Sequence, residues 1–481
     1  MLSPHRLVSV VYFAILVCGC GSPITNPAAS LGDPARTTSV HRESLRMLMQ
    51  DPNPLEADDL DAIQGLAYRP GYEQDTRLEG LAYLKRVDRE MLITTLRRRL
   101  PRVADHEWLR ALCNFVAEEE LIELDEALVS SWGRPWSGNL PDVERPEYQA
   151  LLQLHGEGAP EAIVWETFLS ATRPSQNGLR FRCWDLLHRL GQRDQLIELV
   201  VAESSEDHAA HPLMQPLRAA AVSFGTVPWN REEVLWIHKL AEPERQVFWA
   251  SAEAATATLS PERRKALEIR DLPIVAAAAA HRPELLAVSE GQLYTQIARK
   301  LSGQRHYREQ DPGFLPGKDI DHYLSSHREI LTWGDLLAMS MAVEALEMPQ
   351  VRRHLFHFAD RDLADETTEY GGVIDLDANG RFNIREFPPR MRVHDRRFEA
   401  PQDMFDAGYT GLFHFHYHVQ KHRNGTHAGP GGGDMAYADN TRANCLVFTF
   451  VNENTLNVDF YRHDGVLVDL GVILRPMSGR G

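Results

Sequence analysis

The sequence predicts a multidomain chain, with an α-helical amino-terminal region followed by a smaller α/β or α+β domain. Between about residues 43 and 300, apolar residues recur at the three- and four-residue spacing of amphipathic helices. From about residue 369 the apolar spacing changes to two, which is typical of half-buried strands. A glycine- and proline-containing segment, residues 303–330, separates the two patterns, and we place the domain boundary at residues 340/341.

Residues 1–19 are predicted to be a signal peptide and not part of the fold. Their apolar run, Leu7 to Val17, is too short to cross a bilayer as a helix but suits a secretory signal. The segment Val17-Cys18-Gly19-Cys20 resembles a bacterial lipobox, which implies lipidation of Cys20. An ordinary secretory signal and a retained anchor are the alternatives. Residues 20–42 are rich in Ser, Pro, Thr and Ala, which predicts a flexible tether.

The charge balance and the predicted anchor indicate which partners and which cellular location to expect. Its net charge is −17 at pH 7, whereas nucleic-acid-binding proteins carry a basic footprint, so we expect no nucleic-acid partner. The lipid anchor would attach the protein to a membrane in the cell envelope, on the periplasmic side. Gly21 follows the lipobox where an Asp would favour inner-membrane retention, so we expect the outer membrane.

The three cysteines outside the signal region are Cys113, Cys183 and Cys445. They are far apart in the sequence and odd in number, so no disulfide framework is indicated. We expect each of them to be a small buried side chain.

The helical region, residues 43–340, is predicted to be a scaffold of short amphipathic helices. One segment follows Asp105, a predicted N-cap, and places five apolar residues on one stripe: Trp108, Leu109, Leu112, Phe115 and Val116. Successive helices of this kind favour an α-solenoid or an irregular helical bundle, although no period identifies a repeat family. Such a scaffold would recognise a protein partner or position a substrate.

The carboxy-terminal domain, residues 341–481, is predicted to contain six strands. A helix from about residue 334 to 346 precedes them, and Asn379-Gly380 is a strong hairpin signal between the first two. The expected strands are residues 372–377, 382–387, 411–418, 445–451, 456–461 and 466–473. A short helix is expected at residues 434–443, between the third and fourth strands.

Three histidines, His414, His416 and His418, alternate along the third predicted strand. Because side chains in a strand alternate between faces, all three would project from one side of the sheet. Asp434 follows a glycine-rich turn and offers a carboxylate. Imidazole nitrogens with a carboxylate oxygen and an open fourth position suit a zinc ion. The sequence therefore predicts a metal site here.

The order of these residues resembles the JAMM (MPN-plus) zinc metalloproteases over about residues 345–478. The resemblance rests on Glu369-Tyr-Gly-Gly372, on Gly411-Leu-Phe-His414-Phe-His416 and on Gly429-Pro-Gly-Gly-Gly-Asp434. It implies a mixed β-sheet flanked by helices, Zn²⁺ held by two histidines and Asp434, and Glu369 activating a zinc-bound water. The implied reaction is hydrolysis of a peptide or isopeptide bond in a protein or peptide substrate.

The chain departs from the pattern of that family at three places. Gly431 replaces the serine whose hydroxyl assists the oxyanion, which leaves a backbone N–H of Gly431 as the substitute. Tyr417 replaces the proline after the second histidine. The interval from His416 to Asp434, 434 − 416 = 18 residues, is longer than usual. Two ligand registers therefore stay open: the Gly411 offset favours His414 with His416, whereas the longer loop favours His416 with His418.

A competing motif, residues 375–386, matches an EF-hand calcium loop. Asp375, Asp377, Asn379 and Glu386 would be the side-chain ligands and Gly380 the turn. The flanking residues do not read as helices, and a hairpin with an Asn-Gly turn explains the same residues. Two alternatives to the hydrolase therefore remain: a non-catalytic metal-binding or protein-interaction lipoprotein, and a calcium-dependent binding module.

Overall fold

The computed structural model describes residues 24–134, 140–202, 214–307, 321–392 and 398–476. The predicted signal peptide and the predicted lipidation site at Cys20 lie outside the described residues. The chain divides into two compact units, residues 1–163 and residues 164–481, and each is described by itself. Within the described ranges, no helix is both long enough and apolar enough to cross a membrane.

The first unit consists of short helices, as the periodicity predicted. Asp105 caps α6 by accepting hydrogen bonds from the backbone N–H groups of Glu107 and Trp108, which confirms the predicted N-cap. The helices are α1 (Pro27–Gly32), α2 (Thr38–Gln50), α3 (Ala57–Gln64), α4 (Gln74–Val87), α5 (Arg89–Arg99), α6 (His106–Glu118), α7 (Asp125–Trp132) and α8 (Pro146–His155). Helix α9 (Ala159–Ser170) contains the division between the units.

Helix α1 and the first residues of α2 occupy positions that composition alone assigned to a flexible tether, residues 20–42. Asn26 caps α1 and Pro27 stands at its first position, a combination that starts a helix in a segment otherwise poor in helix formers. Leu31 is fully buried, and its carbonyl accepts a hydrogen bond of 2.8 Å from the Tyr72 hydroxyl. Burial of Ala28 and Leu31 and two long-range hydrogen bonds to the Leu31 carbonyl, from Tyr72 and from Arg69, therefore order this segment.

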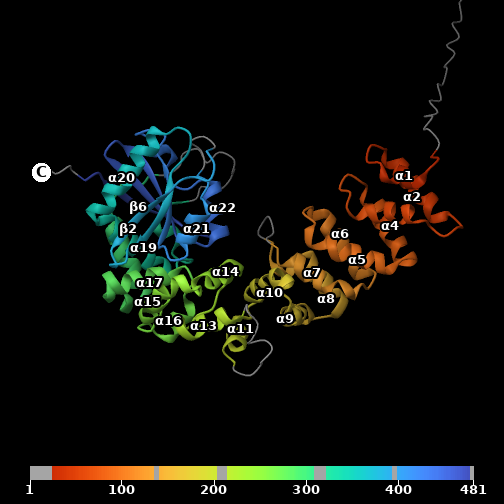
Figure 1. Ribbon diagram of the computed structural model, residues 1–481, viewed down its shortest axis with the longest axis horizontal. Helices are drawn as coiled ribbons and strands as arrows, with labels where there is room; N and C mark the ends of the chain where they lie inside the picture. Colours follow the sequence, from red (N-terminus) through yellow and green to blue (C-terminus); the bar gives the residue numbers. More distant parts are fainter. Residues whose placement is uncertain (1–23, 135–139, 203–213, 308–320, 393–397, 477–481) are drawn as a thin grey trace, which may run out of the picture. The chain divides into compact units, whose positions relative to one another are not determined.

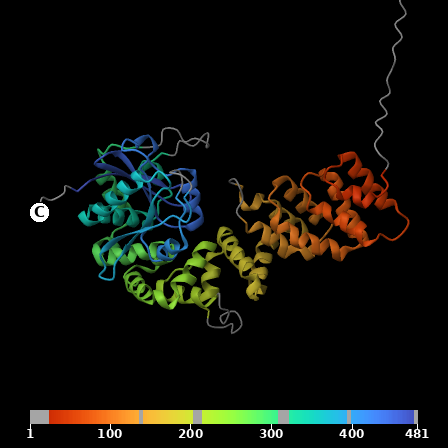
Figure 2. The ribbon, with the colours of Figure 1, turned by 45° about the horizontal axis from the view of Figure 1, so that its top comes forward.

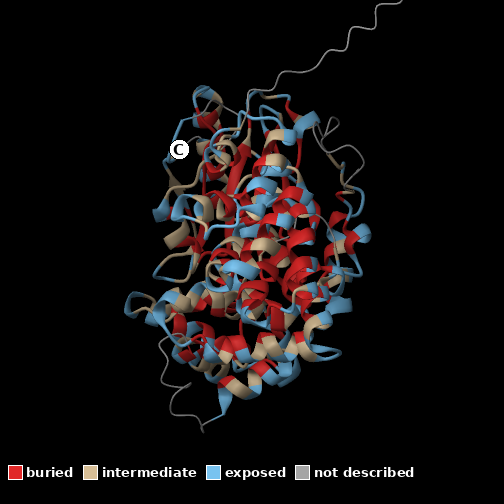
Figure 3. Cartoon of the chain, turned by 90° about the vertical axis from the view of Figure 1, so that its right-hand side faces the viewer, coloured by how far each residue is buried: buried red, intermediate tan, exposed pale blue. Residues whose placement is uncertain are grey.

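The second unit begins with helices and ends with a sheet, which confirms the predicted fold class. Figure 3 shows by colour that helices of the chain have a buried side and an exposed side. The described helices of the second unit come after α9 in the sequence. They are α10 (Asn177–Arg189), α11 (Arg193–Val201), α13 (Met214–Phe224), α14 (Arg231–Leu240), α15 (Gln246–Thr256), α16 (Pro261–Ala266), α17 (Asp271–His281), α18 (Glu290–Leu301), α19 (Trp333–Glu347), α20 (Pro349–Ala364), α21 (Gln402–Gly408) and α22 (Gly432–Thr441). In sequence, α21 and α22 lie between strands, whereas the other helices precede the sheet (Figure 2).

All six predicted strands are present and form one mixed sheet in the order β2-β1-β3-β4-β5-β6. Strands β3 and β4 are parallel, and the other neighbours are antiparallel. The strands are β1 (Gly371–Leu376), β2 (Phe382–Phe387), β3 (Phe413–His418), β4 (Cys445–Asn452), β5 (Thr455–Tyr461) and β6 (Leu467–Leu474). The β1–β2 hairpin turns at Asn379-Gly380, where Gly380 takes the left-handed φ of 73° that the turn requires.

The two faces of the sheet differ in chemistry. One face carries Phe413, Phe415 and Tyr417 of β3 and packs in a single apolar core with residues from α17, α18, α19 and α20. The opposite face carries the alternating histidines and is covered by α21 and α22, so that α20 and α22 lie on opposite sides of the sheet in Figure 1. The three cysteines described above are free and buried, as predicted.

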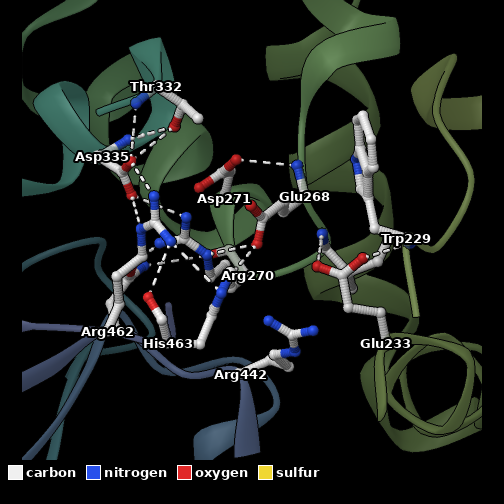
Figure 4. A network of polar contacts seen from close by, with 12 residues as sticks. Trp229, Glu233, Glu268, Arg270, Asp271, Thr332, Asp335, Arg442, Arg462 and His463 are labelled. Atoms are coloured by element: carbon white, nitrogen blue, oxygen red, sulfur yellow. Dashed lines mark hydrogen bonds and ion pairs between the residues drawn. The ribbon is translucent and has the colours of Figure 1, made fainter. Parts of the chain in front are cut away.

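A buried polar network connects the helices to the sheet (Figure 4). Arg270, just before α17, donates hydrogen bonds of 2.7 Å to Glu268 and to Asp335. Arg462, just after β5, donates two more to the Asp335 carboxylate, at 2.7 and 2.9 Å. Arg270 also donates to the side chain of Asn444, the residue that precedes β4. The helices of the second unit and the sheet are therefore parts of one structure.

Candidate metal centre

Strand β3 positions the histidines at the middle of the sheet, between β1 and β4. His416 is paired in register with Gly371 on one side and Val447 on the other. His414 and His416 are both buried, each with 6% of its surface exposed. Glycine at position 371 admits the ring of Phe398, because a Cβ there would lie 2.6 Å from Cε1 of Phe398. The imidazoles are thus held by a rigid, buried strand.

His416 and His418 converge on Asp434. Their Nε2 atoms lie 3.2 Å apart. The Oδ2 atom of Asp434 lies 3.3 Å from Nε2 of His416 and 3.6 Å from Nε2 of His418. Three potential ligand atoms from two elements therefore point into one small volume, and this is the arrangement that a cation requires.

Asp434 reaches the histidines from the first turn of α22. Its Oδ2 accepts a hydrogen bond of 2.8 Å from the backbone N–H of Gly431, which fixes the carboxylate at the start of the helix. Burial disfavours the charged carboxylate, but the charges and hydrogen bonds of His416 and His418 outweigh burial and hold the pKa of Asp434 well below its usual range. Asp434 is therefore an ionised oxygen donor at neutral pH.

Glu369 lies between α20 and β1 and completes the group. One carboxylate oxygen of Glu369 and one ring nitrogen from each of His416 and His418 all lie within 4.8 Å of one another. The amide of Gln420 donates a hydrogen bond of 3.3 Å to Oε1 of Glu369. Burial raises the pKa of Glu369, and the nearby histidines only partly oppose that shift. A carboxylate whose pKa lies nearer neutrality is a better proton acceptor and donor.

Both converging histidines have a partner for the second ring nitrogen. Nδ1 of His418 lies 3.2 Å from the carbonyl oxygen of His427 and donates to it. Nδ1 of His416 lies 3.4 Å from the hydroxyl of Tyr461 on β5. Partners of this kind orient metal-binding imidazoles and leave Nε2 for the ion. Tyr461 and the carbonyl of residue 427 were not identified from the sequence, because nothing local connects them with β3.

His414 has a different environment, although it lies on the same face. Its Nδ1 lies 2.8 Å from the hydroxyl of Tyr437 on α22, and its Nε2 has no hydrogen-bond partner. Burial lowers the pKa of His414 to about 4, so the ring is neutral at physiological pH. A Cβ at Gly408 would lie 2.1 Å from Nε2, so only glycine admits the imidazole there. The structure thus brings His416 and His418, but not His414, to Asp434.

The site opens into a cavity of about 650 Å³. Glu369, the three histidines of β3 and Asp434 line the cavity, together with Tyr437, Asn440 and Tyr461. Phe398 and Met404 contribute an apolar wall. The cavity is therefore large enough for a ligand beside the histidines and combines apolar walls with a few convergent polar groups, as binding sites do.

Gly431 does not supply the free donor that the sequence pattern suggested. Its N–H donates to the Asp434 carboxylate and is therefore not available to a substrate oxygen. The other neighbours of the turn are also constrained: Gly429 has a φ of 95°, and a Cβ at that position would lie 2.3 Å from Cε1 of His322. The glycines of this turn shape the backbone that delivers Asp434.

The residues of the calcium-loop motif belong to the β1–β2 hairpin, and their carboxylates are paired with arginines. Asp375 lies 2.9 Å from Arg385, and Glu386 lies 2.6 Å from Arg361. Asp377 accepts the backbone N–H of Asn379 at 2.8 Å and thereby closes the turn. The hairpin explains these side chains without an ion.

No protein family, no curated protein and no solved structure matches this chain. The donor set alone therefore indicates a metal at this site. Glu369, His416 and His418 offer ligand atoms that all lie within 4.8 Å of one another. Nitrogen and oxygen donors of this kind, with Asp434 beside them, fit a first-row divalent ion such as zinc.

Proposed function

We propose that the second unit binds Zn²⁺ through His416, His418 and Asp434 and hydrolyses an amide bond in a peptide or isopeptide substrate. The observation that carries the proposal is the position of Asp434 Oδ2, 3.3 and 3.6 Å from the two Nε2 atoms, with Glu369 beside them at the wall of a cavity. Three ligands leave one position open for water, which is the arrangement of a catalytic zinc site.

Each residue of the site has a distinct task in this proposal. His416 and His418 present lone pairs because their Nδ1 atoms are engaged with Tyr461 and the carbonyl of residue 427. Glu369 takes a proton from the attacking water and delivers it to the leaving nitrogen, a task that its raised pKa favours. Zinc, when bound, supplies a Lewis acid that lowers the pKa of water and polarises the substrate carbonyl.

The first test is metal content. Elemental analysis of the protein purified without its signal peptide should find about one zinc per chain, and Asp434→Ala should lose it. Asp439→Ala is the matched control. Asp439 lies on the same helix, but its carboxylate accepts a hydrogen bond from the backbone N–H of Asp464 and does not contact the histidines. Absence of metal from the wild type after reconstitution would contradict the proposal. Iron in place of zinc would change the proposed metal, because two histidines and one carboxylate also suit a non-haem iron site.

Catalysis is tested separately from binding. Glu369→Gln keeps the shape of the side chain but removes its basicity, so the variant should retain zinc and lose cleavage of a mixed peptide library, followed by mass spectrometry. Zinc binding without turnover in the wild type would favour the second candidate function, a metal-binding lipoprotein that interacts with proteins. The feature that favours this alternative is Gly431, whose N–H is occupied by Asp434.

We also propose that lipidation of Cys20 anchors the protein in the cell envelope, on the periplasmic side and at the outer membrane. The lipobox-like segment at residues 17–20 supports the anchor, and Gly21 supports the choice of membrane. Cys20→Ala should shift the protein from the membrane fraction to the soluble fraction of the periplasm. Equal membrane association of the variant would contradict the anchor. In the anchored protein, the helical region would bind a protein partner or present the substrate.

A further inference from the structure

A general base must present one of its oxygens to the water that it deprotonates. Glu369 lies between α20 and β1 and lines the cavity, with 5% of its surface exposed. The amide nitrogen of Gln420 donates a hydrogen bond of 3.3 Å to Oε1 of Glu369, and the backbone N–H of Phe398 also donates to this carboxylate. Two donors therefore hold the carboxylate, and Gln420 is the one whose donor belongs to a side chain.

The orientation of the Gln420 amide follows from its neighbours. A backbone carbonyl oxygen can only accept a hydrogen bond. The carbonyl oxygen of His418 lies 3.1 Å from Nδ2 of Asn424, which is therefore the donating end of the Asn424 amide. The same Nδ2 donates to Oε1 of Gln420 at 2.6 Å, so Nε2 is the atom of Gln420 that faces Glu369. The hydrogen bonds thus run in one direction, from the Asn424 amide to the Glu369 carboxylate.

Asn424 is anchored to the sheet. It has 1% of its surface exposed, and its backbone N–H donates a hydrogen bond of 2.8 Å to the carbonyl of Phe450 on β4. Its own carbonyl accepts the N–H of His427 at 2.8 Å, and the carbonyl of His427 in turn orients the imidazole of His418. The segment of residues 419–427 therefore contacts both a predicted metal ligand and, through Gln420, the predicted base.

We propose that Gln420 is a positioning residue for Glu369, and that Asn424 sets the direction in which Gln420 donates. The hydrogen bond to Oε1 would leave Oε2 as the oxygen that meets the attacking water. The long interval between His416 and Asp434 then has a function, because it contains the residues that orient the base. The inference rests on the proposed function, since Glu369 needs a metal-bound water from which to take a proton.

The first test uses acetohydroxamic acid as a probe of the cobalt-substituted protein, whose visible spectrum reports both the metal and the bound probe. This acid coordinates a metal through both oxygens and gives its hydroxyl proton to a neighbouring carboxylate, here Glu369. Gln420→Leu should leave the spectrum of the probe-free protein unchanged and weaken probe binding roughly tenfold to a hundredfold, as loss of a hydrogen bond to a charged group does. Equal affinities in the wild type and Gln420→Leu would overturn the proposal.

Gln420→Glu separates this role from a structural one. The substituted side chain has the same length and can still accept the hydrogen bond from Asn424, but it has no donor for Glu369. We expect it to bind the probe at least as weakly as Gln420→Leu, whereas wild-type affinity would show that Gln420 only stabilises its loop and would overturn the proposal. With a peptide that the wild type cleaves, both variants should lower kcat and leave KM unchanged.

Gln402→Leu is the matched control. The Gln402 amide also donates to a carboxylate, that of Asp406 within α21 at 3.2 Å, and its loss should not change probe binding. Because Gln420 is exposed, its variants should unfold at the same temperature as the wild type. Loss of cobalt from Gln420→Leu would overturn the proposal, because the amide would then support the metal ligands and not the base. A wild type that binds no cobalt would instead overturn the proposed function itself.

Discussion

At the scale of single residues, the carboxylates beside His418 change the pKa of its imidazole. Burial lowers its pKa, but the hydrogen bond and charge of Asp434 and the charge of Glu369 outweigh burial and raise the pKa to about 9. Metal-free protein therefore carries a proton on His418 at neutral pH. A metal ligand must be unprotonated, so metal binding has to displace that proton.

This competition predicts a pH dependence with a defined sign. Below about pH 9 the protonated form of His418 dominates in the metal-free site, so apparent metal affinity should rise roughly tenfold per pH unit and level off above pH 9. Calorimetry in buffers of different ionisation enthalpy should also detect release of about one proton per metal at pH 7.

His414→Asn provides the control for that prediction. The pKa of His414 is lowered to about 4 by burial, so His414 does not titrate between pH 6 and 9 and its replacement should leave the slope unchanged. A metal affinity that is independent of pH between 6 and 8 would show that His418 is not a ligand.

At the scale of elements, the start of β4 connects the helical layer to the histidine strand. Asn444 receives a hydrogen bond from Arg270 through its side chain, and its carbonyl accepts the N–H of His414 at 2.9 Å. Arg270 is fully buried and also neutralises Glu268 and Asp335. Removing one partner of such a network leaves uncompensated charge in the interior.

Arg270→Met should therefore destabilise the second unit strongly, by about 3–5 kcal/mol, because Glu268 and Asp335 lose their shared cation. Urea unfolding followed by tryptophan fluorescence measures the change. Arg381→Met is the control, since Arg381 pairs with Asp377 on the surface, and its unfolding midpoint should stay close to that of the wild type. Similar midpoints for the two variants would mean that the network does not hold the helices to the sheet.

A second contact between elements acts on the wall of the cavity. Trp236 of α14 donates a hydrogen bond of 2.8 Å to the carbonyl of Tyr409, the residue that follows α21. Arg245, directly before α15, donates one of 3.3 Å to the carbonyl of Asp406 within α21. Because Met404 of α21 lines the cavity, helices remote in sequence fix one side of the candidate site.

At the scale of the whole molecule, the sheet depends on helices that precede it. The apolar core that contains Phe413, Phe415 and Tyr417 continues without interruption into Leu336 of α19 and Ile274 of α17. A chain cut at the predicted boundary of residues 340/341 would lose α17, α18 and half of α19. The apolar face of the sheet would then be exposed to water, at a cost of about 25 cal/mol for each Å².

Two fragments test this dependence. Residues 164–481 should fold and bind metal with the same stoichiometry as the full chain, because that unit contains both the sheet and its helical cover. Residues 341–481 should fail to give cooperative thermal unfolding by circular dichroism. A cooperative transition with metal binding in the shorter fragment would show that the boundary at 340/341 marks an independent domain.

The site was predictable from sequence only in part. Alternation along β3 identified His414, His416 and His418 as one face, and Glu369 and Asp434 were named from their order in the chain. The choice between His414 with His416 and His416 with His418 required the structure, because the length of the loop before α22 decides which pair of histidines on β3 faces Asp434. That helix places Asp434 beside His416 and His418, and places Tyr437 beside His414.

The sequence by itself determined the helical character of the chain from about residue 43, the six strands, the Asn379-Gly380 turn and the single face that the histidines share, because each of these follows from local periodicity or local backbone preference. Only the tertiary structure decided that β3 lies parallel to β4, that Tyr461 and residue 427 orient the imidazoles, and that α17 to α20 cover the sheet. These contacts join residues far apart in the chain. Their positions depend on packing and buried hydrogen bonds, which the spacing of neighbouring residues does not encode.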